Sequence, residues 1–531
     1  MSKKNRHIIM YSLYKMESII LLTVLMYSCS RPPSYTRYTF TPEDNPSVFK
    51  QDKNDWDINK EIIFKLHMRD GSVYIMKDWK INDGDSVITG FGGLLDVNRN
   101  LIKKDNFTIF IKDIALVETN ELNTNPSIIT LALVTGASLG MTIYCIMNPK
   151  ACFGSCPTFY ASNGSEMQLQ AEGFSGAIAP SLEDKDIDAL YFAKGDNGNL
   201  LLKMKNEALE THVVRYADIL AVPKSENSRV FTSGEGKFYK TENIISPASV
   251  KAEEGVITEK LIKFDNRQRF SLADSNDLAK KEFIEINFKD LPAGEKGLIL
   301  AYRQTLMTTF IFYSTLGYMG NSAGNYFAML ERDDGSFMKS VYGSKEVLGG
   351  IKVYVQDKNE EWKDLGEFFE LGPISTDIQL LKLNESIHGD CKLRLELTKG
   401  LWRLDYLALA NKIKEVQPIR IQPSYVIKEN SNDKKAFEEL TDNAQTLATL
   451  PGDEYLINYK LPDEYQDYEI FLESKGYYIE WMRKEWTKNE NPLMLSKLIL
   501  NPKQFFKDIA PEFKKLEPNM EESFWRSKYV R

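Results

Sequence analysis

The chain has 531 residues, of which 43% are hydrophobic and 11% aromatic, and it carries 67 Lys and Arg against 75 Asp and Glu. This length exceeds what one core supports, and the apolar content excludes global disorder. The net charge of −8, with no block of basic residues, disfavours a nucleic-acid partner, because phosphate binding needs clustered cations. Five cysteines in such a length exclude a scaffold built from disulfides.

The N-terminus has the composition of an export signal. Lys3, Lys4 and Arg6 form a positive segment, and residues 18–27 form an apolar run. The run has the length of the hydrophobic region of a signal peptide and is too short to span a bilayer. We therefore predict a signal peptide over residues 1–28.

A small residue followed by cysteine, Ser28-Cys29, ends this apolar run. The pattern resembles the bacterial lipobox, although Met26 stands where leucine is usual and Tyr27 is bulky. The resemblance implies acyl chains of the palmitate type on Cys29, a membrane as partner, and a lipid-anchored location in the bacterial cell envelope, at the outer membrane or the periplasmic face. The alternative is a plain signal peptide or an uncleaved anchor.

Two segments follow the anchor. Residues 29–56 are rich in Pro, Ser and Thr and predict an extended tether. In residues 57–122, Ile62, Phe64 and Leu66 alternate with polar neighbours, and Asp-Gly pairs mark turns. This pattern predicts a small β-barrel of the SH3-like or LSm-like kind.

The segment 123–150 contains an uncharged stretch, residues 127–147. As a helix this stretch would be about 30 Å long, which matches a hydrocarbon core. Ala132, Gly136 and Gly140 would then form one stripe of small residues, a geometry that favours close helix packing. The alternatives are a helix that packs in or against a membrane and a buried helix or hairpin between two β-domains.

In the rest of the chain, the alternation of apolar and polar residues predicts further β-domains, and the periodicity near the C-terminus predicts a helix. We expect a β-domain over 151–235, an irregular connection over 236–289, an antiparallel β-sandwich over 290–415 and a mixed region over 416–531, with an amphipathic helix at 502–516. The sequence CKLRLELTKGLWRLDYLALA resembles the closing strands of galactose-binding-like jelly rolls. The predicted fold class is therefore mostly β and multi-domain, with a hydrophobic helix and a C-terminal helical tail.

No catalytic or metal-binding constellation is present in the sequence. His67, His212 and His388 are far apart, and GFSGA lacks the spacing of a nucleophile elbow. The D-x-D-x-D run of residues 184–188 lacks the glycine and the distal glutamate of a calcium loop, so we expect a solvated turn there. We expect no cofactor and no metal.

The cysteines allow one structural prediction. An exported chain lies in an oxidising compartment, and Cys152 and Cys156 are close enough in sequence to pair, so we predict a disulfide between them. Cys145 lies in the apolar segment and is a competing partner for Cys152. Cys391 is expected to be a buried free thiol.

Several segments of the chain together resemble a set of uncharacterised bacterial envelope proteins. The resemblance covers roughly residues 150–485 and rests on SCPTFY, AEGFSGAIAPSLE, NEALETH, GLWRLDYLAL and GYYIEW. It implies no activity and no catalytic residues. The sequence favours a structural or interaction scaffold of the envelope, with other envelope proteins or glycans as partners. The alternatives are a glycan- or ligand-binding lipoprotein and a glycoside hydrolase that uses two carboxylates.

The lipobox resemblance predicts that cells fed labelled fatty acid incorporate the label into this protein. Because the thiol is the acceptor, Cys29→Ala should abolish labelling, whereas Ser30→Ala, one residue further on, should leave it unchanged. Equal labelling of the Cys29→Ala variant and the wild type would refute the lipid anchor.

Overall fold

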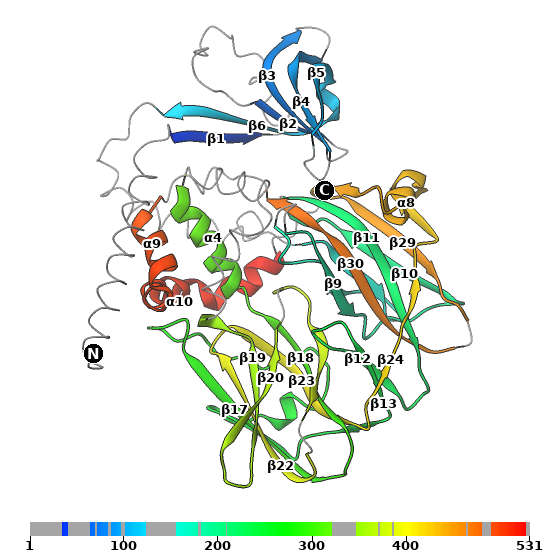
Figure 1. Cartoon of the computed structure of the whole chain (residues 1–531), viewed down its shortest axis with the longest axis vertical. Helices are drawn as coiled ribbons and strands as arrows, with labels where there is room; N and C mark the ends of the chain where they lie inside the picture. The colour runs from blue at the N-terminus through cyan, green and yellow to red at the C-terminus, as the bar shows by residue number, and fades with distance from the viewer. Residues whose placement is uncertain are drawn as a thin grey trace, which may run out of the picture.

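The computed structural model describes residues 34–40, 64–68, 72–82, 86–96, 101–123, 156–178, 182–208, 210–320, 347–369, 372–384, 387–463, 466–480 and 490–526. Five β-sheets and four α-helices make up these residues, which confirms the prediction of a mostly β, multi-domain chain with a helical C-terminal end. One sheet lies apart at the N-terminal end, and the other four stack into two sandwiches (Figure 1).

The N-terminal sheet is antiparallel and has six strands in the order β1-β6-β2-β3-β4-β5. Phe64, Leu66, Ile88 and Val117 form its small core, which is separate from the cores of the sandwiches. The predicted hairpin near residue 70 is present, since His67 pairs with Val73. The strands are β1 (Ser34–Phe40), β2 (Phe64–Met68), β3 (Val73–Asn82), β4 (Val87–Leu95), β5 (Leu101–Phe110) and β6 (Ile114–Asn123).

The first strand of this sheet falls inside the predicted tether. Strand β1 pairs with β6 through seven residue pairs, from Ser34 with Asn123 to Phe40 with Val117. The prediction of an extended tether is therefore wrong for residues 34–40. Tyr, Thr and Phe dominate this strand, and their β propensity outweighs the Pro- and Ser-rich composition around it.

The first sandwich consists of two antiparallel sheets, which we call sheet B and sheet C. Sheet B has the order β27-β26-β29-β10-β7-β8, and sheet C has β25-β11-β30-β9 with β28 paired to β11. Their strands are β7 (Thr158–Ser162), β8 (Met167–Glu172), β9 (Asp184–Ala189), β10 (Asn199–Lys205), β11 (Glu210–Pro223), β25 (Ile419–Ile421), β26 (Tyr425–Lys428), β27 (Ser431–Asn432), β28 (Leu447–Thr449), β29 (Glu454–Lys460) and β30 (Tyr468–Glu480). Helix α8 (Lys434–Thr441) packs at one end, and Asp433 caps it by accepting a hydrogen bond from the Ala436 N–H.

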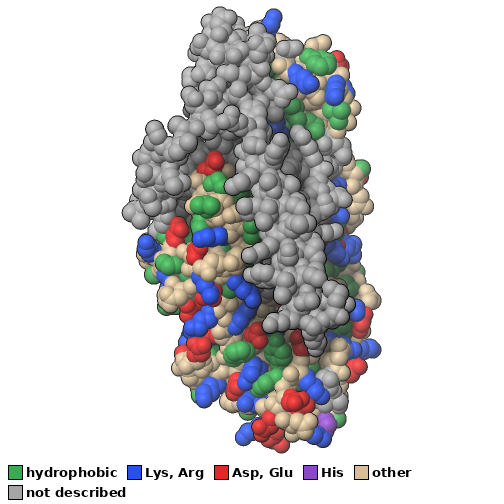
Figure 2. Space-filling view, turned by 60° about the vertical axis from the view of Figure 1, so that its left-hand side comes forward, with side chains coloured by type: hydrophobic (Ala, Val, Ile, Leu, Met, Phe, Trp, Pro, Cys, Tyr) green, Lys and Arg blue, Asp and Glu red, His purple; other side chains and the backbone are tan. Residues whose placement is uncertain are grey.

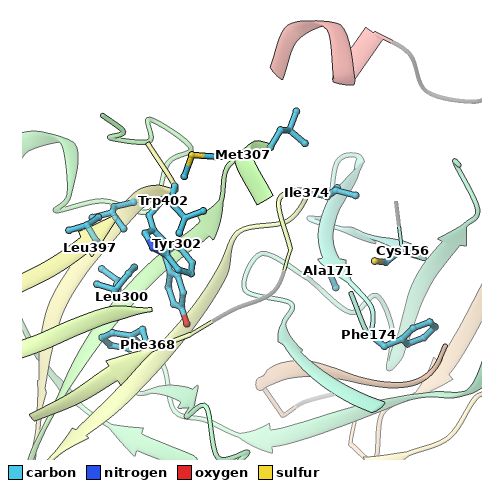
Figure 3. Packing of buried hydrophobic residues seen from close by; sticks show 14 of the residues in the cluster. Cys156, Ala171, Phe174, Leu300, Tyr302, Met307, Phe368, Ile374, Leu397 and Trp402 are labelled. Atoms are coloured by element: carbon cyan, nitrogen blue, oxygen red, sulfur yellow. The ribbon is translucent and has the colours of Figure 1, made fainter. Parts of the chain in front are cut away.

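The second sandwich consists of sheets D and E. Sheet D has the order β14-β23-β18-β21-β12-β13-β24, and sheet E has β16-β15-β17-β22-β19-β20. Their strands are β12 (Arg229–Thr232), β13 (Phe238–Thr241), β14 (Asn243–Ile245), β15 (Ser249–Ala252), β16 (Gly255–Val256), β17 (Lys281–Leu291), β18 (Lys296–Gln304), β19 (Ile351–Gln356), β20 (Trp362–Phe368), β21 (Asp377–Leu383), β22 (Gly389–Thr398), β23 (Trp402–Asn411) and β24 (Lys414–Val416). In the interior, Tyr302 packs between Phe368 and Trp402 at ring-centroid distances of 5.6 and 5.7 Å (Figure 3).

The irregular connection predicted over 236–289 is wrong, because five strands, β13 to β17, lie wholly or partly within it. The polar composition of this segment wrongly indicates an irregular structure, because some of its charged residues are buried inside the sandwich. Arg269 is fully buried and bonds both Glu254 and Glu282. The predicted sandwich at 290–415 is present, but it also includes the strands from residue 229 onward.

The second sandwich is an insertion within the first. Strand β11 leads into it and β25 leads out of it, and the two strands pair, with Ala221 opposite Ile419. Strands β11 and β30 also pair over almost their whole lengths. Residues 156–223 and 419–480, predicted as parts of two separate regions, therefore form one domain. Closely spaced chain ends are the usual condition for such an insertion.

The two sandwiches share a core where sheet C packs on sheet D. Leu220 and Phe471 of sheet C meet Ile299, Leu380 and residues around Phe238 of sheet D. Strand β18 is buried along its whole length, because it packs against sheet E on one side and sheet C on the other. Burial on both faces explains why residues 297–302 form an apolar run without alternation. The four sheets thus form one stack in the order B, C, D, E.

Three helices pack together beside the stack (Figure 1). They are α4 (Met307–Met319), α9 (Pro492–Leu500) and α10 (Pro502–Arg526). Phe310 of α4 packs on Phe513 of α10 at a ring-centroid distance of 5.2 Å. The amphipathic helix predicted at 502–516 is confirmed and extends ten residues further.

The shared core predicts that Phe471→Ala lowers the stability of the whole stack. Phe471 is fully buried and packs edge-on against Phe238, so its truncation should lower the free energy of unfolding by about 3–5 kcal/mol. Tyr425→Ala, at a residue that is 41% exposed, is the control and should change it by about 1 kcal/mol or less. Denaturant titration measures both, and equal effects would contradict the shared core.

Candidate functional site

A pocket of about 430 Å³ opens where the two sandwiches meet. Its walls come from strand β8, the turn after β9, the loop 264–268, the loop 374–376 and the end of helix α10. Junctions between domains are common places for ligand sites, and this volume falls in the usual range of such pockets. The pocket is therefore the candidate functional site in the described part of the chain.

One wall of the pocket is aromatic. Tyr191, Phe192 and Phe264 form a triangle with ring-centroid distances of 4.9–5.1 Å. The guanidinium of Arg229 stacks 3.7 Å from the centroid of Tyr191, and Glu469 holds it with two hydrogen bonds of 2.8 and 2.7 Å. Stacking and ion pairing together fix the orientation of this wall.

The remaining lining is mostly uncharged and polar. It includes the amides Gln168, Gln170, Asn266 and Gln268, and the hydroxyls of Ser375 and Thr376. Some of these groups bond one another across the walls: Gln268 Nε2 donates to Thr376 Oγ1 at 2.8 Å, and the Phe192 N–H donates to Gln170 Oε1 at 2.9 Å. Among the described residues, the lining contains no carboxylate.

Buried carboxylates hold the backbone of the walls from behind. Glu172 accepts hydrogen bonds from the N–H groups of Ile374 and Ser375 at 2.7 and 3.3 Å. Asp405 accepts one from the Asn266 N–H at 2.9 Å, and Asp377 accepts one from the Ala189 N–H at 3.2 Å. Three walls of the pocket therefore each have a carboxylate anchor.

These anchors lie away from water, which changes their titration. Burial raises the pKa of Glu172 to about 7, although hydrogen bonds from backbone amides and from the thiol of Cys156 act against it. Burial also raises the pKa of Asp405 to about 6 and that of Asp377. Burial and the nearby charge of Asp377 raise the pKa of Asp186 to about 7. Protonation of Glu172, Asp186 and Asp405 therefore falls in the range from weakly acidic to neutral pH.

The end of helix α10 closes another side of the pocket. Trp525 lines it, and Glu521, one turn earlier, bonds both Arg303 and Arg403. Arg303 also donates to the carbonyl oxygen of Pro373 at 2.6 Å, so one guanidinium links the helix to the loop 374–376. Sequence reasoning missed this contact because its partners lie far apart along the chain.

The structure places few of the residues singled out from the sequence. Cys29, Cys152 and the stripe Ala132, Gly136 and Gly140 lie outside the described residues, so the lipid anchor, the disulfide and the helix-packing stripe stay predictions. Cys156 is buried beside Glu172. Cys391 is a buried free thiol, as predicted.

The histidines and the acidic run form no site in the described residues. His212 is buried and lies 2.9 Å from Glu210, His67 is buried in the N-terminal sheet, and His388 is exposed. The D-x-D-x-D run is part of strand β9, so the prediction of a turn is wrong there. No group of three or more His, Cys, Asp or Glu side chains in the described part of the chain has the arrangement of a metal site.

No helix in the described residues is both long and apolar enough to cross a membrane.

Comparisons with known proteins assign no family to this chain. No family profile matches it, and no curated protein matches it. One solved structure, that of the Gx strain of infectious bursal disease virus, aligns over 93% of this chain and 90% of that chain at 9% identity. Its TM-score of 0.14 is too low to show a common fold.

The aromatic wall also shows what sequence reasoning missed. Phe264 and the pair Tyr191-Phe192 are about seventy residues apart and belong to different sandwiches. No spacing rule brings such residues together, and only the packing of sheet C on sheet D does so.

Because the pKa values of the anchor carboxylates are raised in the folded state, we predict that their contribution to stability falls as pH rises. Unfolded, Glu172 titrates near 4.5; folded, it titrates near 7, so between these values the folded state holds a proton that the unfolded state has lost. Glu172→Gln keeps an acceptor for the two amides and cannot ionise. The free energy of unfolding of Glu172→Gln minus that of the wild type should therefore increase between pH 4 and pH 8. The increase should be up to about 3 kcal/mol.

Denaturant titrations at several pH values measure this difference. The exposed Glu235→Gln is the matched control and should show the same pH dependence as the wild type. A Glu172→Gln profile parallel to the wild-type profile would contradict the burial effect.

Proposed function

We propose that this chain is a lipid-anchored protein of the bacterial envelope whose pocket between the two sandwiches binds an uncharged saccharide. The aromatic wall of Tyr191, Phe192 and Phe264, together with the amide and hydroxyl side chains in the same lining, carries the proposal. Aromatic rings offer a flat apolar surface to the C–H face of a sugar ring, and amides both donate and accept hydrogen bonds to its hydroxyls.

The charge of the lining supports an uncharged ligand. Arg303 is the charged side chain in the lining, and its bonds to Glu521 and Pro373 already use its guanidinium. A ligand with a free carboxylate or phosphate would therefore find no uncompensated cation there. A neutral sugar can replace its hydrogen bonds to water with hydrogen bonds to the amides, and no charge is left unpaired.

Binding is favoured over hydrolysis. A glycoside hydrolase of the usual kind needs two carboxylates flanking the scissile bond, and the described residues of the lining include none. Glu172 and Asp377 lie behind the walls, where they accept hydrogen bonds from backbone amides. The envelope location rests on the N-terminal lipobox pattern, and a scaffold that binds other envelope proteins remains the second candidate because of the several β-domains.

The proposal predicts that Phe264→Ala weakens saccharide binding. An array of neutral and acidic oligosaccharides identifies the ligand, and isothermal titration then measures its affinity. Loss of the ring should lower the affinity about tenfold, which corresponds to about 1.4 kcal/mol. Phe283→Ala, at a residue that is 46% exposed on the second sandwich, is the control and should bind as the wild type does.

Two results would contradict the proposal. One is that no oligosaccharide binds to folded protein. The other is that Phe264→Ala and Phe283→Ala have the same effect on binding. Preference for acidic over neutral saccharides would contradict the assignment of an uncharged ligand.

A further inference from the structure

Exposed apolar side chains gather on two paired strands at one edge of the N-terminal sheet. Leu101, Ile102 and Phe110 of β5 are 50–57% exposed, and Phe91 of the neighbouring β4 is 42% exposed. The other large apolar residues exposed in the described part of the chain are spread over many elements. Leu101 and Ile102 lie at one end of β5, Phe110 lies at the other end, and Phe91 lies opposite Asn106 between them. Exposed apolar side chains on adjacent strands can form part of an interaction surface. We call these four residues the edge patch.

Three lysines lie beside the edge patch, and one of them, Lys103, pairs with the carboxylate of Asp105 at 3.5 Å. Lys103 and Lys104 follow Ile102 directly, and Lys112 follows Phe110 by two residues. Their ammonium groups lie near aromatic rings: Lys103 Nζ is 5.2 Å from the centroid of Phe107 and Lys112 Nζ is 5.4 Å from that of Phe110. Green and blue side chains lie side by side at the top of the molecule (Figure 2). The surface therefore combines apolar side chains with cations.

The backbone of this edge is protected against pairing with another strand. The ladder between β4 and β5 has an irregularity at Leu94 and Leu95, opposite Leu101. The N–H of Asn106 is bonded by the carboxylate of Asp105 at 2.8 Å. Bulges, lysines and satisfied amides are devices that stop edge strands from pairing. Strand addition by a second copy or another protein is therefore disfavoured. The exposure of the apolar side chains in the edge patch needs a different explanation.

We propose that the edge patch and its lysines rest on an anionic lipid bilayer. Apolar side chains enter the interface between headgroups and acyl chains, and lysines beside them attract anionic headgroups by about 1 kcal/mol each. The inference rests on the lipid anchor of the proposed function. Strand β1 begins five residues after Cys29, which places the start of the sheet within about 17 Å of the acylated residue.

The contact would fix the orientation of the whole chain. A lipid anchor alone leaves the protein free to rotate on its tether, whereas a second attachment restricts that rotation. Strand β1, which follows the predicted anchor Cys29 in the sequence, and strand β5 of the edge patch are the two end strands of one sheet, and this sheet lies apart from the two sandwiches (Figure 1).

The test uses the full chain in vesicles of phosphatidylglycerol and phosphatidylcholine. Ile102→Cys carries an environment-sensitive fluorophore, and lipids with a nitroxide on the acyl chain serve as quenchers. Val256→Cys, at a residue that is 75% exposed on sheet E, is the matched control. Labelled wild-type protein corrects for its own cysteines. Quenching at residue 102 should be several-fold greater than at residue 256, and Lys103→Glu with Lys104→Glu should reduce it.

Each outcome separates this inference from the proposed function. Vesicle-bound protein with equal quenching at residues 102 and 256 overturns the inference but leaves the anchor intact. Protein that does not float with vesicles overturns the anchor itself. Equal quenching in vesicles of phosphatidylcholine alone overturns the role of anionic lipid. A probe at residue 102 that is shielded from water but not quenched by lipid points to a protein partner and overturns the membrane contact.

Discussion

The packing of sheet C on sheet D is the interaction on which the rest of this structure depends. Both sandwiches have interiors of their own, but the core that contains Phe471, Leu220 and Ile299 turns two domains into one four-layer stack. Burial of apolar area at about 25 cal/mol per Å² stabilises such a contact without directional bonds. The pocket exists because the two sandwiches are held at a fixed distance along one end of this contact.

The loops that form the pocket are also held in place by buried carboxylates, and the burial of these carboxylates lowers the stability of the folded state. A carboxylate removed from water is destabilised unless it is paired, and Glu172, Asp377 and Asp405 are compensated mainly by backbone N–H groups. Their pKa values are raised because the effect of burial exceeds that of these hydrogen bonds. A structure that retains such groups gains precise placement of loops rather than stability, since apolar residues of similar volume would be less costly. The anchors therefore support the interpretation of the pocket as a binding site.

Local patterns in the sequence predict the parts of the fold that depend on neighbours in the chain. Alternation predicts strands such as β19, β22 and β23, and periodicity predicts α10. The sequence is misleading where polar residues are internal, as with Arg269 between Glu254 and Glu282, and where short edge strands leave little pattern. Insertion of one sandwich into the other is also invisible locally, because the pairing of β11 with β30 joins segments about 250 residues apart.

The candidate site is harder to predict than the fold for the same physical reason. Its aromatic wall combines residues of two domains, and its anchors act on backbone amides, which have no signature in a sequence. In the described residues, the carboxylates behind the walls act as acceptors for backbone amides, and the lining combines aromatic and uncharged polar side chains with the ion-paired Arg303. This arrangement supports the binding role that we propose for the pocket. The inserted domain makes such a pocket possible, because both sandwiches contribute to its walls together with the end of helix α10.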